Sequence, residues 1–237
     1  MKLELRNVYA AYLKDLFVLN GVDLEVAEGR VTIVIGPNGS GKSTILKSIC
    51  GILTPSIGSI KLDGREIAGI PLDGIIRLGI AYIPQDRSIF PQMTVTENLE
   101  LGCWVFRRDR GKVRRQVRRA LERFPVLAER SAMQAGAMSG GLQRILDIAK
   151  ALITDPGLLL VDEPSVGLSP LVAAMIYDAL AALKSEGRTI LLVDQDVRSA
   201  MEIADDVYVL ELGKVKAHGE RREFDGRLGE VVRGWLI

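Results

Sequence analysis

The chain has 237 residues, a length that fits one domain with a sizeable core, and 48% of its residues are hydrophobic, as in an ordinary globular protein. Its net charge of +1 excludes an overall field that would draw the chain to nucleic acid or acidic lipid. No apolar run approaches the roughly 18–20 residues of a membrane span, the first ten residues lack the apolar core of a secretory signal, and Cys50 and Cys103 have no metal-ligand spacing. We therefore expect a soluble, cytosolic chain with free thiols, which leaves docking on a membrane protein open.

Two kinds of strand are predicted. Apolar and acidic residues alternate in residues 21–26 (GVDLEV), which indicates a half-buried antiparallel strand. Residues 59–67 (SIKLDGREI) place Asp63-Gly64 between two alternating runs, a pattern typical of a hairpin. In contrast, residues 31–35, 158–161 and 189–193 are continuously apolar, as in strands that are covered on both faces. Residues 208–219 predict a closing hairpin around Leu212-Gly213.

Helical patterns separate the apolar strands. Residues 111–124 carry apolar side chains at near four-residue spacing, and from about Met93 to Gly136 no strand is predicted. A second helix is predicted over 170–187, with Gly187 as its C-cap and an apolar face of Leu171, Met175, Ile176, Leu180 and Leu183. The sum predicts one α/β domain over residues 1–237, with a mainly parallel central sheet, an antiparallel β part near the N-terminus and a helical subdomain inserted at approximately 93–155.

A glycine-rich motif follows the first buried strand. Residues 36–44 (GPNGSGKST) stand between that strand and a helical pattern, which is the context that makes a phosphate-binding loop credible. The loop N–H groups and the helix N-terminus would hold phosphates, Lys42 would reach the β- and γ-phosphates, and Ser43 would offer its hydroxyl to Mg²⁺. The alternative is a structural turn. The other nucleotide-binding candidates in the loop are Gly36, Asn38, Gly39, Ser40, Gly41 and Thr44.

A pair of acids ends the second buried strand. Asp162 fits the carboxylate that holds Mg²⁺ in phosphate-loop nucleotidases, and Glu163 is placed to orient and deprotonate an attacking water. The alternative is a pair of solvated loop acids.

The stretch AMSGGLQRILDIAKAL (residues 137–152) resembles the signature of ATP-binding-cassette (ABC) ATPases. Ser139, Gly140 and Gly141 would form a second anion site at a helix N-terminus, or else an ordinary helix cap. The resemblance implies a P-loop NTPase fold, ATP and Mg²⁺ as ligands, and two subunits packed head to tail so that each signature covers the ATP of the other.

Other positions match the family in part. Tyr12 resembles the aromatic residue that stacks on adenine, and Gln85 the glutamine that touches Mg²⁺ or the attacking water and couples to the membrane partner. Gln195 stands where most members have a switch histidine, so γ-phosphate sensing through a neutral N–H donor is possible but a charged imidazole is not. Ser169 replaces a usual aspartate and puts a cross-subunit contact in doubt. The alternatives are a surface tyrosine, a turn glutamine and an inert strand-end residue.

Residues 83–99, 162–170 and the tail VVRGWLI resemble the ATPase subunits of branched-chain amino acid importers, although Leu142 and the VDQD of residues 193–196 depart from that subfamily. The resemblance implies transmembrane permease subunits, a second cassette (a paralogue or a second copy), an indirect extracytoplasmic solute-binding protein and a place on the cytoplasmic face of the inner membrane. Two hypotheses compete with an importer motor that hydrolyses ATP: a dimerising ATP-binding module with weak hydrolysis, and a soluble ATPase acting on nucleic acid, which is not the expected partner.

The stretch RRDRGKVRRQVRR (residues 107–119) packs eight basic residues against one acid. Contact with nucleic acid or lipid headgroups is one interpretation. The stronger one is that Val113, Val117 and Leu121 face inward while the arginines solvate the outer face. Trp104 and Phe106 would lie in the core or on the surface that meets a membrane subunit. The single histidine, His218, is expected to be structural or exposed.

Overall fold

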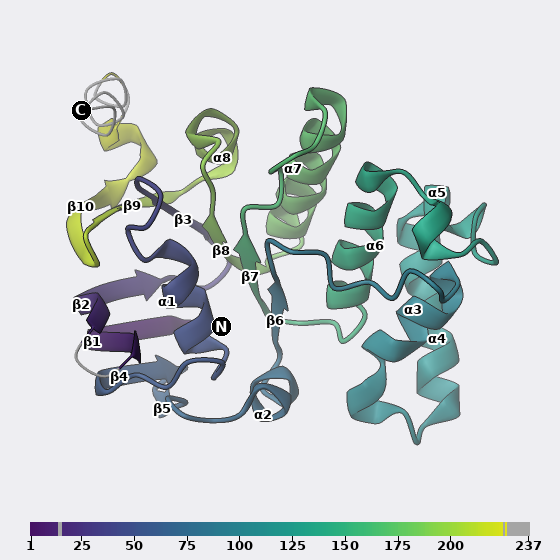
Figure 1. The fold of residues 1–237 in the computed structure, drawn as a ribbon, viewed down its shortest axis with the longest axis horizontal. Coiled ribbons are helices and arrows are strands. Elements are labelled where there is room, and N and C mark those ends of the chain that lie inside the picture. The colour runs from purple at the N-terminus through teal and green to yellow at the C-terminus, as the bar shows by residue number, and fades with distance from the viewer. Residues whose placement is uncertain (14–15, 225, 227–237) are drawn as a thin grey trace.

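The computed structural model describes residues 1–13, 16–224 and 226, and its strands form two sheets (Figure 1). The first is antiparallel, in the order β2-β1-β4-β5. Val22, Leu24 and Val26 are buried, so the predicted alternation is confirmed. At the β4–β5 hairpin, Asp63 and Gly64 have φ of 48° and 80°, the left-handed pair that a tight hairpin turn requires. The strands are β1 (Leu3–Leu13), β2 (Leu16–Val26), β4 (Ile57–Leu62) and β5 (Arg65–Glu66).

The second sheet has six strands in the order β10-β9-β3-β8-β7-β6, and all neighbours are parallel except β9 and β10. Every residue of β3, β7 and β8 is buried, which confirms the prediction drawn from their unbroken apolar runs. The closing hairpin also forms around Leu212-Gly213. The strands are β3 (Val31–Ile35), β6 (Ile80–Ile83), β7 (Leu158–Asp162), β8 (Thr189–Val193), β9 (Asp206–Glu211) and β10 (Lys214–Glu220).

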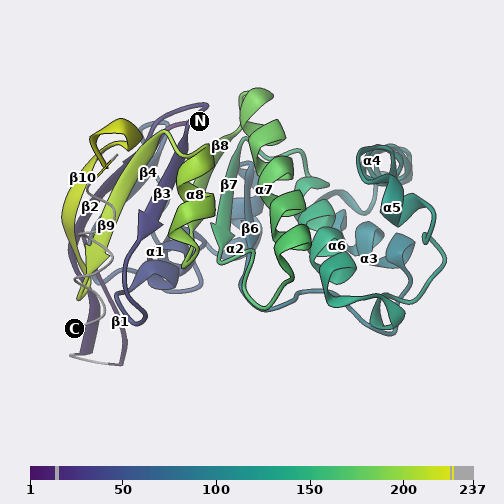
Figure 2. The same ribbon diagram turned by 90° about the horizontal axis from the view of Figure 1, so that it is seen from above.

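Helices cover both faces of the second sheet (Figure 2). Helix α1 (Lys42–Ile49) buries Ile45, Leu46 and Ile49 in a core that it shares with the antiparallel sheet and with one face of β3, β7 and β8. Helices α7 (Pro170–Ser185) and α8 (Val197–Ile203) pack on the opposite face. The short helix α2 (Leu72–Arg77) precedes β6. The loops that follow β3, β6, β7 and β8 therefore gather at one edge of the sheet.

The remaining helices form a unit with its own core, set to one side of both sheets in Figures 1 and 2. Between residues 93 and 136, all of which are described, the only β interaction is an isolated bridge from Thr94 to Gln134, so the prediction of no strand there is confirmed. That this unit is a subdomain inserted at approximately 93–155 stays a prediction. Its helices are α3 (Val95–Gly102), α4 (Arg110–Arg123), α5 (Pro125–Ala128) and α6 (Gly140–Leu152), with single 3₁₀ turns at Trp104–Phe106 and Ala135–Ala137. A third 3₁₀ turn, Arg221–Phe224, follows β10 outside this unit.

Part of the predicted apolar face of α7 is exposed. Ile176, Leu180 and Leu183 of α7 are buried as expected, but Leu171 and Met175 are 76% and 46% exposed. Helix α7 packs against the sheet with only part of its apolar surface, which spacing alone does not reveal. Three smaller predictions are confirmed: Val117 of α4 is buried with Val113 and Leu121 against the same core, both cysteines are free, and His218 is exposed and stacks on Tyr208. The tail VVRGWLI (residues 231–237) lies outside the described residues.

Candidate functional site

A cavity of about 460 Å³ lies at the edge where the loops after β3, β6, β7 and β8 meet. It brings together segments that are far apart in the sequence, as expected for the carboxyl ends of parallel strands. Every residue that lines it except Val18 is a predicted site residue: Tyr12, Asn38, Gly39, Gly41, Lys42, Ser43, Thr44, Gln85, Glu163 and Gln195. The roles assigned to these side chains remain predictions.

The loop from Gly36 to Gly41 connects β3 to α1 and has the form of a phosphate cradle. A Cβ at Gly36 would lie 2.1 Å from the backbone oxygen of Leu210, so only glycine fits this close approach. Gly39 and Gly41 have φ of 79° and 104°, and Gly41 caps α1, whose first N–H groups have no helical partner. The buried hydroxyl of Ser40 has no hydrogen-bond partner within the described part of the chain. The unpartnered Ser40 hydroxyl, the N–H groups at the start of α1 and the open space next to Gly39 fit an anionic ligand such as the triphosphate of ATP.

Lys42 is 5% exposed, and its ammonium is held by the loop itself. Its Nζ donates to the backbone oxygens of Gly36 at 2.9 Å and Pro37 at 3.0 Å. Burial lowers the pKa of Lys42, although the carboxylates of Glu163, Asp162 and Asp194 oppose that shift. A phosphate beside Nζ would favour the charged form.

Asp162 ends β7 next to the start of α1. Its Oδ1 accepts a hydrogen bond from the Ser43 hydroxyl at 2.9 Å, and its Oδ2 accepts one from the Tyr82 hydroxyl at 3.1 Å. Burial raises the pKa of Asp162, and these two hydrogen bonds oppose the shift. The Ser43 hydroxyl, the Asp162 carboxylate and the Gln85 amide each offer an oxygen as a metal ligand. Mg²⁺ prefers oxygen ligands of this kind, with phosphates and water completing its coordination shell. The residues present therefore fit the ion.

Glu163 and Gln195 form a direct contact across the cavity. The Nε2 of Gln195 donates to Oε2 of Glu163 at 2.7 Å, and the Glu163 side chain is only 5% exposed. Glu163 has φ of 43°, an uncommon value for a residue with a side chain and one that is often found at functional sites. Its backbone N–H donates to the oxygen of Val193, which fixes the turn. The glutamine that replaces the usual histidine thus orients the candidate base.

Asp194 holds the backbone of Gln195 in place through a hydrogen bond, and no sequence motif assigned Asp194 a role. It is 1% exposed, and its Oδ1 accepts from the backbone N–H groups of Gln195 at 2.7 Å and Asp196 at 3.0 Å. Its Oδ2 accepts from the Tyr177 hydroxyl at 2.6 Å, and the Ser165 hydroxyl lies 3.4 Å from both oxygens. Burial raises the pKa of Asp194 despite these hydrogen bonds. This carboxylate joins the loop after β8 to the loop that carries Glu163.

Tyr12 and Gln85 lie at the rim of the cavity. Tyr12 is 53% exposed, and its hydroxyl lies 3.4 Å from the Oγ1 of Thr44. The ammonium of Lys47 lies 5.7 Å from the centre of the Tyr12 ring. Gln85 enters the cavity from the loop after β6.

The Ser139 turn is not brought to this cavity. Ser139 caps α6 by accepting a hydrogen bond from the N–H of Leu142 at 3.4 Å, and Gly140 and Gly141 form the first turn of that helix. None of the three is among the residues that line the cavity. An anion held by this turn would therefore belong to a nucleotide bound elsewhere, as a head-to-tail dimer requires.

Arg144 on α6 is a buried residue near the site that the sequence analysis missed. It is 3% exposed, and its guanidinium donates to the backbone oxygens of Pro84, Asp162 and Pro164 at 2.6, 3.3 and 3.2 Å. These prolines adjoin Gln85 and Glu163. Arg144 lies four residues before the buried Ile148, so its place on the apolar stripe was a signal that was available in the sequence.

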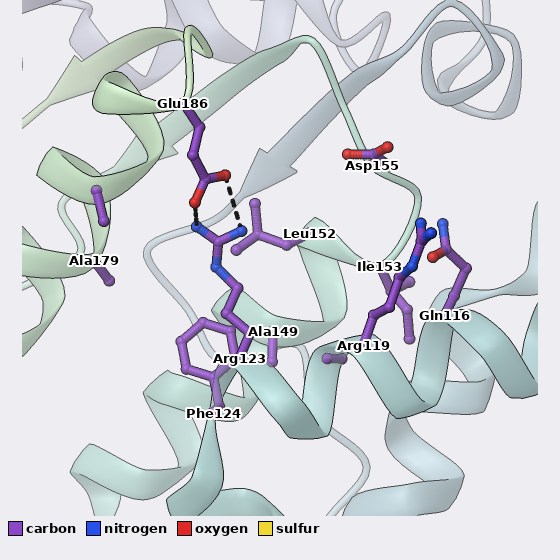
Figure 3. A pocket seen from close by; sticks show the side chains of 12 residues that line it. Gln116, Arg119, Arg123, Phe124, Ala149, Leu152, Ile153, Asp155, Ala179 and Glu186 are labelled. Atoms are coloured by element: carbon purple, nitrogen blue, oxygen red, sulfur yellow. Dashed lines mark hydrogen bonds and ion pairs between the residues drawn. The ribbon is translucent and has the colours of Figure 1, made fainter.

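A second cavity, of about 430 Å³, lies between the helical unit and α7 (Figure 3). Arg123 at the end of α4 points toward Glu186, and its two terminal nitrogens donate to the two carboxylate oxygens at 2.7 and 3.1 Å. Leu152 and Ile153 of the α6 end contribute apolar surface to the cavity. None of the predicted site residues is among those that line it. The ion pair instead joins the helical unit to the α/β core.

Three comparisons place the chain among known proteins. A family model described as ABC transporter matches residues 19–166. The high-affinity branched-chain amino acid transport ATP-binding protein BraG of Pseudomonas aeruginosa is 41% identical over 88% of this chain and 89% of that protein, and the probable branched-chain amino acid transport ATP-binding protein LivF of Archaeoglobus fulgidus is 40% identical over 89% of each.

A solved dimeric ATP-binding cassette in a post-hydrolysis state, bound to ADP and phosphate, superposes with a TM-score of 0.81 at 26% identity, covering 93% of this chain and 99% of that one. This likeness and the two sheets of the chain confirm the predicted α/β class with a mainly parallel sheet and an antiparallel part. Because the family model spans more than half of the chain and BraG exceeds 40% identity over most of it, the chain belongs to the ABC transporter family.

Proposed function

We propose that this chain is the ATP-hydrolysing motor subunit of a membrane importer for branched-chain amino acids or a related small polar solute. An ATP-binding subunit of this family hydrolyses ATP, and the cavity that unites the cradle, Asp162 and Glu163 supports that activity here. The solute is inferred from the names of BraG and LivF. Within the described residues no helix is long and apolar enough to span a membrane.

Catalysis at this site would rest on positioning and charge. The loop N–H groups and Lys42 would hold the triphosphate, while bound Mg²⁺, held by Ser43, Asp162 and Gln85, would neutralise charge on its oxygens. Glu163 would take a proton from a water aligned with the γ-phosphate, and the hydrogen bond from Gln195 fixes its carboxylate. The observation that carries the proposal is this buried, oriented carboxylate beside the cradle.

The complete site would need a second cassette. Ser139, Gly140 and Gly141 lie outside the cavity of their own chain, so in a head-to-tail dimer they would cover the nucleotide of the partner. The solved cassette bound to ADP and phosphate is a dimer, which supports the need for a second cassette. The partner is a paralogue or a second copy of this chain.

A groove next to the helical unit would receive a permease segment. This cavity of about 440 Å³ has a mainly apolar lining that includes Leu72, Ile76 and Val105, and Trp104 at its edge is 60% exposed. An amphipathic helix of a permease fits an apolar groove of this kind. Because the chain would sit beneath the permease, we place it on the cytoplasmic face of the inner membrane, with an extracytoplasmic solute-binding protein as an indirect partner.

The groove is connected to the nucleotide site through the loop after β6. The backbone N–H and hydroxyl of Ser88 donate to Asp147 at 3.0 and 2.7 Å, and Lys150 donates to the backbone oxygen of Ser88. Ser88, Asp147 and Lys150 line the groove, and Gln85 lies three residues before Ser88. A permease segment that presses on this loop would therefore shift Gln85, which gives transport a route to hydrolysis.

The test is phosphate release by the purified chain with Mg²⁺ and ATP. Sustained release is expected, with loss in Lys42→Ala, while Glu163→Gln should bind ATP, dimerise and fail to turn it over. Glu129→Gln, which changes an exposed glutamate of α5's end, serves as the matched control and should behave like the wild type. Binding and dimerisation without release by the wild type would favour the alternative, a dimerising module weakened by Gln195 and Ser169.

A further inference from the structure

The segment from Trp104 to the end of α4 carries the densest charge of the chain. It contains two acids, Asp109 and Glu122, against nine basic residues, a net charge of +7 (9 − 2) in a chain whose total is +1. The rest of the molecule is therefore net negative. The nine basic residues are Arg107, Arg108, Arg110, Lys112, Arg114, Arg115, Arg118, Arg119 and Arg123.

These charges face outward and most have no counter-ion. All nine side chains belong to exposed residues, and Arg119 and Arg123 also line the cavity between the helical unit and α7, whereas Val117 and Ala120 of α4 are buried in the helical core. Of the nine, Arg123 is the only one that forms an ion pair within the described residues. Arg110, Arg114 and Arg118 also repeat at four-residue spacing, where like charges destabilise a helix. Solvation alone explains a polar face but not so large an excess of positive charge.

One exposed aromatic ring, Trp104, and the partly buried ring of Phe106 lie at the same end of this face. Trp104 is 60% exposed, and the guanidinium carbon of Arg107 lies 4.2 Å from the centre of its ring. The ammonium of Lys112 lies 4.5 Å from the ring centre of Phe106. Tryptophan beside basic residues is a combination typical of the membrane–water interface, where the ring enters the headgroup layer and the cations meet anionic lipid.

The position of this face agrees with that partner. Trp104 lines both the groove proposed for the permease and a neighbouring cavity of about 580 Å³, which is also lined by Arg107, Arg110 and Arg114. The cationic face therefore begins at the edge of the permease groove. Helix α4 lies at the outside of the helical unit, away from both sheets (Figure 1).

We infer that this basic surface, formed by Trp104 and by the eight basic residues from Arg107 to Arg119, binds the anionic lipid headgroups of the membrane beside the permease. The inference rests on the proposed function, because a permease docked in the groove would bring the bilayer close to α4. Nucleic acid is disfavoured because a single exposed tryptophan at one end provides no row of stacking platforms along the charged face.

The experiment measures sedimentation of the full-length chain with vesicles, either of phosphatidylcholine alone or of equal parts of phosphatidylcholine and phosphatidylglycerol. Binding is expected only to the anionic vesicles and should weaken as salt is raised. The variant R115Q/R118Q/R119Q should bind them on the order of 100-fold more weakly, from the loss of three cations at the surface. Trp104→Ala should weaken binding to the same vesicles by about tenfold.

The control variant K61Q/R65Q/K214Q removes three exposed cations from other parts of the molecule and should bind as the wild type does. Equal binding by the wild type and R115Q/R118Q/R119Q would overturn the inference, and so would binding to neutral vesicles or a preference for RNA over vesicles. ATP hydrolysis by each variant is measured in parallel. If the wild type hydrolyses ATP but does not bind vesicles, the lipid-binding inference is wrong and the proposed function stands. If the wild type does not hydrolyse ATP, the proposed function is wrong.

Discussion

Replacing Gln195 with methionine removes the amide that orients Glu163 and keeps nearly the same side-chain volume. The lost interaction is the 2.7 Å hydrogen bond from Nε2 of Gln195 to the Glu163 carboxylate. A hydrogen bond to a charged group contributes about 1.5–3 kcal/mol. Because Gln195 is an exposed residue, we take the lower value, about 1.5 kcal/mol, which corresponds to roughly a tenfold lower kcat. The KM for ATP should change much less, because the loop and Lys42 hold the triphosphate.

The assay is steady-state phosphate release as a function of ATP concentration, at fixed protein concentration and with Mg²⁺ in excess. Gln195→His is the matched control: near pH 8 its neutral imidazole still offers an N–H donor, so it should keep most of the rate. As the pH falls through about 6.5, the rate of this variant should change because its imidazole becomes charged, while the wild type has no titrating group at this position. A kcat of Gln195→Met equal to that of the wild type would show that Glu163 needs no such support.

Three further predictions concern other contacts of the structure. Tyr82→Phe removes the hydroxyl that donates to Asp162 and should raise the Mg²⁺ concentration needed for half-maximal ATP hydrolysis about tenfold, while calorimetry of ATP binding without metal stays unchanged. Burial raises the pKa of Asp194 above its unfolded value, so the charged carboxylate costs stability at neutral pH, and that cost disappears as the pH falls. In urea unfolding, the wild type should therefore gain stability relative to Asp194→Asn between about pH 7 and pH 4. A difference in stability that stays constant with pH would contradict this. A double-mutant cycle of Arg123→Ala and Glu186→Ala should give a coupling energy of about 0.5–1 kcal/mol in thermal unfolding, because both side chains are partly exposed, and a value near zero would mean that the pair does not join the helical unit to the core.

Local sequence patterns with a known physical basis predict much of the fold. Unbroken apolar runs become the fully buried β3, β7 and β8, and Asp63-Gly64 supplies the two left-handed residues that its hairpin needs. The outward-facing Leu171 shows the limit. Periodicity reports that a helix has an apolar face, but only the tertiary packing decides which part of that face meets a neighbour.

The sequence motifs predicted the loops that line the cavity, but not the residues that hold those loops in place. Lys42 and Glu163 stand in motifs whose spacing indicates phosphate chemistry, and the parallel topology brings their loops to one edge. The residues that hold these loops are linked by long-range contacts with no local signature: Tyr82 reaches Asp162 over 80 positions, and Tyr177 reaches Asp194 over 17. Such contacts depend on how the strands are ordered, which no short motif encodes.

The hydrogen bonds of Arg144 have a consequence for how two cassettes would work together. The same helix that begins at Ser139 is anchored, through one guanidinium, to the backbone beside Gln85 and Glu163. In a head-to-tail dimer, movement of that helix toward the partner's nucleotide would pull on the loops around the chain's own nucleotide. Occupancy of either site would therefore alter the affinity of the other, so the pair would not bind ATP as two independent sites.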